Sequence, residues 1–381
     1  MTKLIAIILL TCATAFAQSV IVKATDAGAV HRAGTGAGSV RGVTVPLLFF
    51  YVSLDGSHTT PFDTWAKAAT NIQAAVNIAT KGNTVIVSNG TYYENLVITN
   101  SITVQSQSNN PAVTIINGNY PVVSNRCVTM NVDSWLIGFM VTNGYLQESA
   151  DYSYGGGIRG GSVSNCIITG NRIRTIDGTT QYSWGGGVAQ ADVYNSWIIG
   201  NTAFGNLYAD GGGAYGCTLR NCKVQENSAE EGSADYGGIC YCTSYNCLIV
   251  SNSAKGVGGG GGAGVIFWNC TVISNSANDG GGGIWLADVF NSISWGNNSE
   301  DVIEYPWTNS CSCGVGYTNT GSITNDPLFV GSGDYNLQSN SPCIDTGTNQ
   351  AWMTGAKDLN DNQRIWNTTV DMGAYEYGSE P

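Results

Sequence analysis

Two aspartates in consecutive sequence repeats are spaced for shared chemistry. Asp210 and Asp235 each lie eleven positions before an asparagine that recurs along the chain, Asn221 and Asn246. If the repeats stack as coils, equivalent residues in neighbouring coils lie about 4.8 Å apart. That distance is close to the roughly 5 to 5.5 Å between the two carboxyl groups of a retaining glycosidase. The same pair could share a proton or bind Ca²⁺, so we predict that both aspartates are catalytic or ligand-binding residues.

Two arginines in the same region fit a different reaction. A polysaccharide lyase needs a base that removes the proton next to a uronate carboxylate and a cation that neutralises this carboxylate. Arg172, Arg174 and Tyr182 are candidates for these roles. The two histidines, His31 and His58, lie outside the repeats. We therefore expect no histidine base beside the arginines.

Aromatic residues gather in the segments that separate the repeats, within residues 145–236. Aromatic faces stack on sugar rings, and carboxylates or arginines bind sugar hydroxyls and acids. We predict a polysaccharide-binding groove beside these segments. The alternative is that the aromatic residues are surface residues of loops and have no role in binding. The candidate substrate-binding residues are Tyr152, Tyr154, Tyr182, Trp184, Tyr208 and Tyr236.

A sixfold repeat must position all of these side chains. Its anchor asparagines are spaced 30, 26, 25, 23 and 22 residues apart, and each is followed six positions later by a second asparagine. The anchors are Asn165, Asn195, Asn221, Asn246, Asn269 and Asn291. The second asparagines are Asn171, Asn201, Asn227, Asn252, Asn275 and Asn297. Short apolar segments between two fixed asparagines predict an all-β, single-stranded right-handed parallel β-helix, in which the asparagine columns form hydrogen bonds along the axis.

The position after each anchor is occupied by cysteine or serine. This column reads Cys166, Ser196, Cys222, Cys247, Cys270 and Ser292. At about 4.8 Å between coils, the Cβ atoms are too far apart for the roughly 3.8 Å of a disulfide, so we expect buried thiols. The alternative is a zinc site that uses the close pairs Cys240 and Cys242 or Cys311 and Cys313.

The termini differ from the repeats. Lys3, an apolar run and Ala15-Phe16-Ala17 indicate a signal peptide over residues 1–17. We expect a loose leader over 18–45, the β-helix over 46–347 with a capping helix over 64–79, and a closing segment over 348–381. Together these segments predict a protein that is secreted, outside the cell or at its surface, with no membrane span.

The composition excludes some classes of partner. The 381 residues include 51 glycines, only 11% are charged, and 27 acidic against 15 basic residues give a net charge of −12. Such a chain repels the phosphates of nucleic acids, and its glycine content is typical of strands and turns rather than helices. We expect a monomer whose partner is a polysaccharide or a cell-surface glycan.

The repeat from Gly155-Gly-Gly-Ile-Arg to Asn165-Cys-Ile-Ile-Thr-Gly-Asn171, with its copies, resembles the secreted right-handed parallel β-helix proteins of the pectate-lyase-like superfamily. The copies also resemble the repeats of polymorphic outer-membrane proteins. Residues 326–377 are similar to the end of many bacterial surface β-helix proteins. The resemblance implies a polysaccharide groove along one face of the coils. It transfers no catalytic residue, because the Gly-His-Gly and Asn-Thr-Asp signatures of polygalacturonase-like hydrolases are missing.

Two functions remain open from the sequence: a polysaccharide lyase or glycoside hydrolase, and a non-catalytic glycan-binding or adhesion solenoid. No cofactor is required by either of them. Ca²⁺ stays open as a ligand, because Asp358, Asn360 and Asn362 alternate as loop ligands do, although the glycine and glutamate of an EF-hand loop are missing and a turn is the preferred interpretation.

Overall fold

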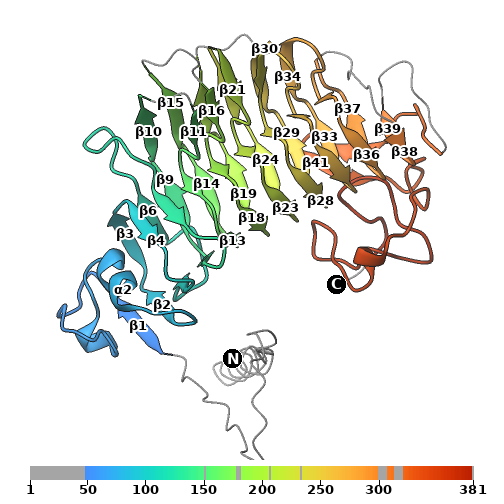
Figure 1. The fold of residues 1–381 in the computed structure, drawn as a ribbon. Coiled ribbons are helices and arrows are strands. Elements are labelled where there is room, and N and C mark those ends of the chain that lie inside the picture. Colours follow the sequence, from blue (N-terminus) through green and yellow to red (C-terminus); the bar gives the residue numbers. More distant parts are fainter. Residues whose placement is uncertain are drawn as a thin grey trace, which may run out of the picture. The chain divides into compact units, whose positions relative to one another are not determined.

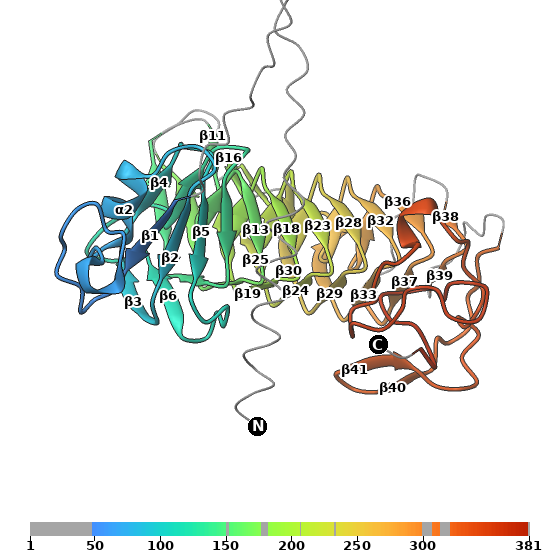
Figure 2. The ribbon, with the colours of Figure 1, turned by 90° about the horizontal axis from the view of Figure 1, so that it is seen from below.

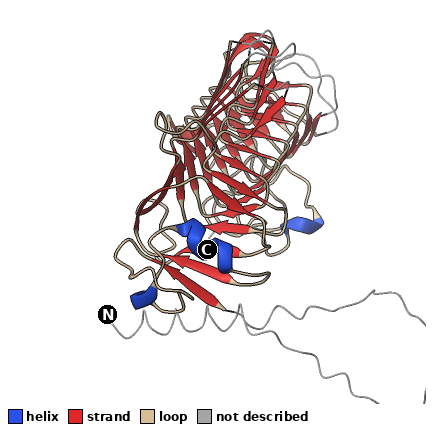
Figure 3. Ribbon diagram, turned by 60° about the vertical axis from the view of Figure 1, so that its left-hand side comes forward, coloured by secondary structure: helices blue, strands red, loops and turns tan. Residues whose placement is uncertain are grey.

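Short parallel strands build most of this chain (Figure 1). The computed structural model describes residues 48–149, 152–176, 182–205, 207–231, 234–298, 307–312 and 321–379. The predicted signal peptide and leader lie outside these ranges. Within them, five parallel sheets and one antiparallel hairpin confirm the all-β parallel solenoid, which contains very little helix (Figure 3). No helix in the described ranges is long and apolar enough to cross a membrane.

Three sheets, named A, B and C, form the walls of the solenoid. Sheet A consists of β1 (Phe49–Val52), β2 (Thr84–Val87), β5 (Thr103–Ser106), β8 (Trp135–Ile137), β13 (Ser162–Ser164), β18 (Asp192–Tyr194), β23 (Thr218–Arg220), β28 (Thr243–Tyr245), β32 (Ile266–Trp268), β36 (Asp288–Phe290) and β38 (Trp307–Thr308). Sheet B consists of β3 (Gly90–Tyr93), β6 (Thr114–Asn117), β9 (Met140–Thr142), β14 (Ile167–Thr169), β19 (Trp197–Ile199), β24 (Lys223–Gln225), β29 (Leu248–Val250), β33 (Thr271–Ile273), β37 (Ile293–Trp295) and β39 (Cys311–Ser312). Sheet C consists of β35 (Ile284–Trp285), β31 (Gly262–Ala263), β27 (Ile239–Cys240), β22 (Ala214–Tyr215), β17 (Val188–Ala189), β12 (Ile158–Arg159), β7 (Val128–Met130) and β4 (Leu96–Ile98).

The segments that separate the repeats form two more sheets, D and E, which together we call the fin. Sheet D consists of β10 (Tyr145–Glu148), β15 (Arg172–Thr175), β20 (Thr202–Phe204), β25 (Ser228–Glu230), β30 (Ser253–Val257) and β34 (Ser276–Asp279). Sheet E consists of β11 (Tyr152–Tyr154), β16 (Tyr182–Trp184), β21 (Tyr208–Asp210) and β26 (Ala234–Tyr236). A small apolar cluster that includes Leu146, Ile173 and Ala209 packs between the two sheets. Each coil in this region therefore visits sheets C, A, B, D and E in turn, and Figure 1 shows β10, β15 and β21 at the edge remote from β13, β18 and β23.

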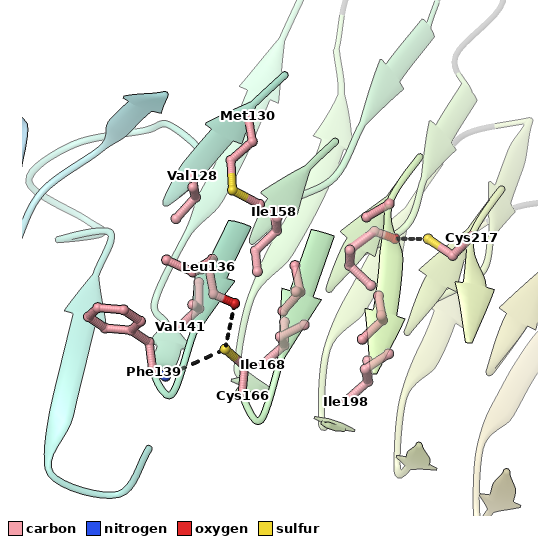
Figure 4. Packing of buried hydrophobic residues seen from close by; sticks show 14 of the residues in the cluster. Val128, Met130, Leu136, Phe139, Val141, Ile158, Cys166, Ile168, Ile198 and Cys217 are labelled. Carbon is pink, nitrogen blue, oxygen red and sulfur yellow. Dashed lines mark hydrogen bonds between the residues drawn. The ribbon is translucent and has the colours of Figure 1, made fainter. Parts of the chain in front are cut away.

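The main core is a continuous column of small and branched apolar side chains between sheets A, B and C. In Figure 4, Cys166 lies among Leu136, Phe139 and Ile168. Its Sγ accepts the Phe139 N–H at 3.4 Å and donates to the Leu136 carbonyl at 3.7 Å. Each coil thus contributes only a few inward residues, and stacking on neighbouring coils completes their burial.

A ladder of buried asparagines follows this core. Hydrogen bonds link the second asparagines of the repeat along the axis. Asn201 Nδ2 donates to Asn227 Oδ1, and Asn227 Nδ2 donates to Asn252 Oδ1, both at 3.0 Å. Asn227 Oδ1 also accepts the main-chain N–H of Asn201 at 3.0 Å. The anchor asparagines instead adopt left-handed conformations, with φ of 53° at Asn221 and 51° at Asn246, where asparagine is tolerated. The predicted structural role of both columns is confirmed.

The cysteine and serine column faces the core as predicted. Cys166 and Cys270 donate their main-chain N–H groups to Ser196 Oγ and Ser292 Oγ, both at 3.0 Å. Every described cysteine is buried and outside a disulfide. Burial raises the pKa of Cys166 to about 12. These thiols therefore behave as small apolar groups, and the described residues contain no cluster of three or more candidate metal ligands; Cys313 of the zinc alternative lies outside the described ranges.

The helix expected over 64–79 is shorter in the structure. A 3-10 turn, η1 (Trp65–Lys67), precedes the helix α2 (Ile72–Ile78). The Asn71 side chain accepts the main-chain N–H of Ala74 at 2.8 Å and so caps the helix N-terminus. That this helix caps the coil stack stays a prediction.

The closing segment folds back beside the last coils, as the red chain in Figures 1 and 2 shows. The closing segment includes the 3-10 turn η2 (Ala351–Met353). A hairpin of β40 (Phe329–Gly331) and β41 (Asp334–Leu337) comes before the closing segment in the chain. Anchor asparagines hold it by their side-chain amides. Asn246 Nδ2 donates to the Lys357 carbonyl at 2.6 Å, and Asn269 Nδ2 donates to the Asp371 carbonyl at 3.1 Å.

A buried charged cluster stabilises the closing segment internally. Arg364 is fully buried, and its Nη2 donates to the carbonyls of Asp371 and Gly373, both at 2.9 Å. The same nitrogen lies 3.7 Å from Glu376 Oε2. Burial raises the pKa of Glu376 to about 8 and that of Asp371 to about 6. Burial therefore favours the protonated form of both carboxyl groups.

Candidate carbohydrate-binding site

Sheet E carries the predicted aromatic residues on consecutive coils. Side chains alternate between the two faces of a strand, and the central residues Ser153, Ser183 and Ala209 are buried towards the interior of the fin. The flanking residues share the other side of the sheet, which we call the aromatic face. It consists of Tyr152, Tyr154, Tyr182, Trp184, Tyr208, Asp210 and Tyr236.

Three tyrosines of the aromatic face form a ladder along the axis. The rings of Tyr152 and Tyr182 stack with centroids 5.2 Å apart, and those of Tyr182 and Tyr208 stack at 4.8 Å. Both faces of Tyr182 are thus covered by its neighbours, and only ring edges and hydroxyls remain available there. Tyr152 begins the row and is 53% exposed. A bound sugar would therefore meet hydroxyl edges along the ladder rather than stack on each ring.

A second aromatic group bridges sheets E and C. Trp184 stacks on Tyr215 at 4.8 Å with an angle of 6° between the rings, and Tyr215 meets Tyr241 edge to face at 5.8 Å. The chain turns between the sheets at Gly185, where φ is 73° and an added Cβ would lie 2.4 Å from the Val188 carbonyl oxygen. Only glycine fits this corner, and the corner is what brings the two rings together.

Asp210 lies among these rings and is only 7% exposed. Its Oδ2 accepts the indole N–H of Trp184 at 2.9 Å. Burial, together with the nearby Cys240 thiol and the Asp210 carboxylate, raises the pKa of Tyr236 to about 12. The same causes raise the pKa of Tyr215 still further. Both phenols are therefore protonated at neutral pH and can donate hydrogen bonds to a ligand.

The predicted alignment of the two aspartates is wrong. In the sheet, Asp210 pairs with Tyr236, and Asp235 pairs with Ala209. The two repeats differ by one residue in the glycine run that follows the strand, because Gly211-Gly212-Gly213 corresponds to Gly237-Gly238. Counting back from the anchors across this run therefore gives a register that is off by one position. The equivalence on which the retaining-glycosidase and shared-proton interpretations depended does not exist.

Arg172 and Arg174 lie on β15 of sheet D. Ile173 between them is buried in the fin, so the two arginines occupy the outer face of sheet D, on the other side of the fin from the aromatic face. Arg174 forms an ion pair with Glu231, and its guanidinium lies 5.5 Å from the Phe204 ring centroid. The structure does not bring the arginines together with Asp210, and their catalytic role stays a prediction.

Some residues of sheet C that border the site were not predicted from the sequence. Tyr215 and Arg159 each lie six positions before an anchor asparagine. The Arg159 guanidinium lies 5.0 Å from the Tyr154 ring centroid. The pairing of β12, β17 and β22 places both in one column. Alignment of this column across the repeats would have found both of them. Tyr241, 61% exposed, follows the next strand of the sheet.

The calcium alternative concerns Asp358 in the closing segment. Its Oδ1 accepts the main-chain N–H groups of Asn360 and Asn362, at 2.8 and 2.9 Å, and its Oδ2 accepts that of Glu376 at 2.9 Å. A carboxylate with three N–H donors stabilises a turn. The geometry supports the turn interpretation of this motif.

Comparison with known proteins bears on the fold. The structure is similar to a crystal structure of pectate lyase Pel9A, with a TM-score of 0.50, 14% identity, and coverage of 87% of this chain and 97% of that one. It is also similar to a rhamnogalacturonan lyase, with a TM-score of 0.39, 14% identity, and coverage of 70% and 74%. The chain has a pectate-lyase-like β-helix fold. No protein-family model matches the sequence, and no curated protein matches it.

Proposed function

We propose that this chain binds polysaccharide through the aromatic face and the adjoining strands of sheet C. The observation that carries the proposal is the combination of the Tyr152–Tyr182–Tyr208 ladder with Asp210, which is held by the indole of Trp184. A row of phenol groups that repeats with each coil suits a polymer that repeats its hydroxyls along one direction. The fold of lyases that act on polysaccharide is consistent with this use.

A catalytic role is the second candidate, and Asp210 favours it. A buried carboxylate beside several protonated phenols provides one group that can accept a proton and others that can donate one. The register of sheet E does not align Asp210 with Asp235 as a glycosidase pair, because Asp210 pairs with Tyr236. Binding without turnover therefore requires fewer groups than hydrolysis or elimination, and it is the function we favour.

The test separates retention from turnover. The purified chain would be incubated with uronate-containing and neutral polysaccharides, while retention on immobilised polymer, unsaturated ends and reducing ends are all measured. We expect retention of at least one polymer without new ends. Unsaturated ends would identify a lyase, and reducing ends alone a hydrolase. Failure to retain any polymer in a broad panel would contradict the proposal.

Paired variants assign the retention to the aromatic face. Trp184→Ala should weaken retention about tenfold or more, because it removes an indole that contacts both Tyr215 and Asp210. Trp197→Ala is the matched control, since Trp197 is 53% exposed on sheet B, away from the fin. Asp210→Asn should abolish any turnover while it leaves retention within a few-fold. Equal losses in the Trp184 and Trp197 variants would remove the assignment.

We further propose that the protein meets its polysaccharide outside the cell, as residues 1–17 predict. We also propose that α2 covers the first coils, because Ile72 and Val76 are buried in the main core. The proposed segment boundaries are those of the sequence: a leader over 18–45, the β-helix over 46–347 and the closing segment after it. Mass spectrometry of the exported chain would test the first of these boundaries.

A further inference from the structure

A glycine leaves a gap in the column of side chains along the corner where sheet C turns towards sheet A. The residue that follows each strand from β12 to β35 lies at this corner and adopts a left-handed conformation. These corner residues are Gly160, Gln190, Gly216, Tyr241, Gly264 and Leu286. Gly216 is exposed, and a Cβ added to it would meet nothing within 4 Å beyond its chain neighbours. The corner is open there, and we call this open position the notch.

Two long side chains flank the notch. Gln190 lies in the coil before Gly216 and Tyr241 in the coil after it, so about 9.6 Å separates their backbones. Arg159 Nε donates to Gln190 Oε1 at 3.2 Å, which leaves the amide nitrogen of Gln190 as a donor. Tyr241 is 61% exposed. A single sugar ring therefore has an amide on one side of the notch and an aromatic ring on the other.

The backbone at Tyr241 is strained. Its φ is 49°, and bulky residues seldom adopt this conformation. Its ring takes the space above Gly264, where an added Cβ would lie 2.9 Å from Tyr241 Cε1, and it meets Tyr215 edge to face at 5.8 Å. The corner residues of both neighbouring coils, Gly216 and Gly264, are glycines and leave room for the ring. Strained residues of this kind are concentrated at ligand-binding and active sites.

The notch lies at the end of a series of rings that starts at the aromatic face. Trp184, which donates to Asp210, stacks on Tyr215, and Tyr215 contacts Tyr241. Burial, followed by the Cys240 thiol and the Asp210 carboxylate, raises the pKa of Tyr241, so its phenol stays protonated and uncharged. The carboxylate of an acidic sugar beside Tyr241 would be repelled by Asp210 in the same way. These surroundings favour a neutral sugar.

We propose that the notch binds one uncharged pyranose unit of the polysaccharide held at the aromatic face. The Gln190 amide N–H groups donate to hydroxyls of this unit, and the Tyr241 ring contacts its apolar C–H surface. Gly216 determines specificity, because a side chain at this position would occupy the space of the sugar. The inference rests on the proposed function and deepens it, since the recognised polymer must contain neutral sugars.

The experiment compares neutral with acidic oligosaccharides. Cellotriose, mannotriose, galactotriose, xylotriose and tri-galacturonate would each be titrated calorimetrically into the full chain. We expect at least one neutral trisaccharide to bind about tenfold or more tightly than tri-galacturonate. Equal or tighter binding of tri-galacturonate would overturn the inference and leave the proposed function standing. Absence of binding by every trisaccharide, together with no retention in the polysaccharide panel, would overturn both.

A matched pair of glycine variants locates the bound sugar. Gly216→Asn fills the notch, and asparagine accepts the left-handed backbone, so the affinity should fall about tenfold or more. Gly200→Asn is the control, because Gly200 has a φ of 63° and equally open surroundings but follows β19 of sheet B. It should leave the affinity unchanged. Equal affinities of the two variants would overturn the inference, and a loss confined to Trp184→Ala would then retain the aromatic face as the binding site.

The contact with the aromatic ring has its own test. Tyr241→Phe keeps the ring and should bind the neutral trisaccharide within about threefold of the original chain. Tyr241→Asn removes the ring without straining the backbone and should lose about tenfold or more. Far-UV circular dichroism checks that the coils of both variants are intact. Equal affinities of the two variants would contradict the contact between Tyr241 and the sugar.

Discussion

Replacement of Asn227 by alanine should lower the free energy of unfolding by about 3 to 5 kcal/mol. Asn227 is fully buried, and its side chain takes part in four hydrogen bonds. Its Oδ1 accepts the main-chain and side-chain N–H groups of Asn201, both at 3.0 Å, and its Nδ2 donates to the Ile198 carbonyl at 2.8 Å and to Asn252 Oδ1 at 3.0 Å. At about 1 kcal/mol for each bond, with extra cost where a buried donor loses its partner, the loss reaches this range.

The measurement is urea unfolding followed by far-UV circular dichroism, with the dependence on urea compared between variants. Asn278→Ala is the control, because it makes the same chemical change at an exposed residue with a single hydrogen bond to the Lys255 carbonyl. It should alter the free energy of unfolding by about 0.5 kcal/mol or less. A loss of under about 1 kcal/mol at Asn227, with an unchanged urea dependence, would refute the structural role of the buried ladder.

Three further outcomes follow from buried groups and from the cap of α2. The pKa of Glu376 is raised to about 8 from an ordinary 4.5, so the folded protein holds a proton that the unfolded chain releases. The free energy of unfolding should therefore fall as pH rises from about 4.5 to about 8, and Glu376→Gln should flatten this part of the profile. Cys127 and Cys166, with pKa values raised to about 12, should resist iodoacetamide at pH 8 until urea unfolds the chain, and rapid labelling of the folded protein would contradict their burial. Asn71→Ala should lower the free energy of unfolding by about 1 kcal/mol and speed amide exchange in β1 and β2; unchanged exchange there would argue against a capping role for α2.

The repeat allowed the solenoid to be predicted because its determinants are local. A column of Asn201, Asn227 and Asn252 at a fixed distance from the anchors specifies a bend, and stacking needs no information beyond the next coil. The inward column that contains Cys166 and Cys222 could be recognised in the same way. The fin was not predicted, although sheet D carries a signal: a buried apolar residue such as Ile173, Ala203 or Ala229 lies two positions after each second asparagine from Asn171 to Asn275. Sheet E follows stretches that vary in length from repeat to repeat, and its register could not be read from the anchors.

The sequence allowed the aromatic residues to be expected close together, but it did not give their register. The aromatic residues of sheet E share one face, as expected for a groove. The pairing of Asp210 with Tyr236, however, arises because one repeat has one glycine more than the next between the strand of sheet E and the anchor asparagine. The docking of the closing segment on the coils could not be inferred at all. It depends on contacts such as Asn246 with Lys357, which are 111 residues apart in the sequence, and no local pattern encodes them.

Among the described residues, sheet E extends over four strands, whereas sheet A extends over eleven. At about 4.8 Å between neighbouring strands, the aromatic face measures only about 14 Å along the axis. Under the proposed function, this length limits how much of a polysaccharide chain the aromatic face can contact. Oligosaccharides should gain affinity with each added unit until they reach this length and gain almost nothing beyond it, so the protein would recognise a short internal stretch or an end of a polymer rather than its full extent. Under the proposed function, the number of coils that carry sheet E, rather than the length of the solenoid, would set the size of the recognised stretch.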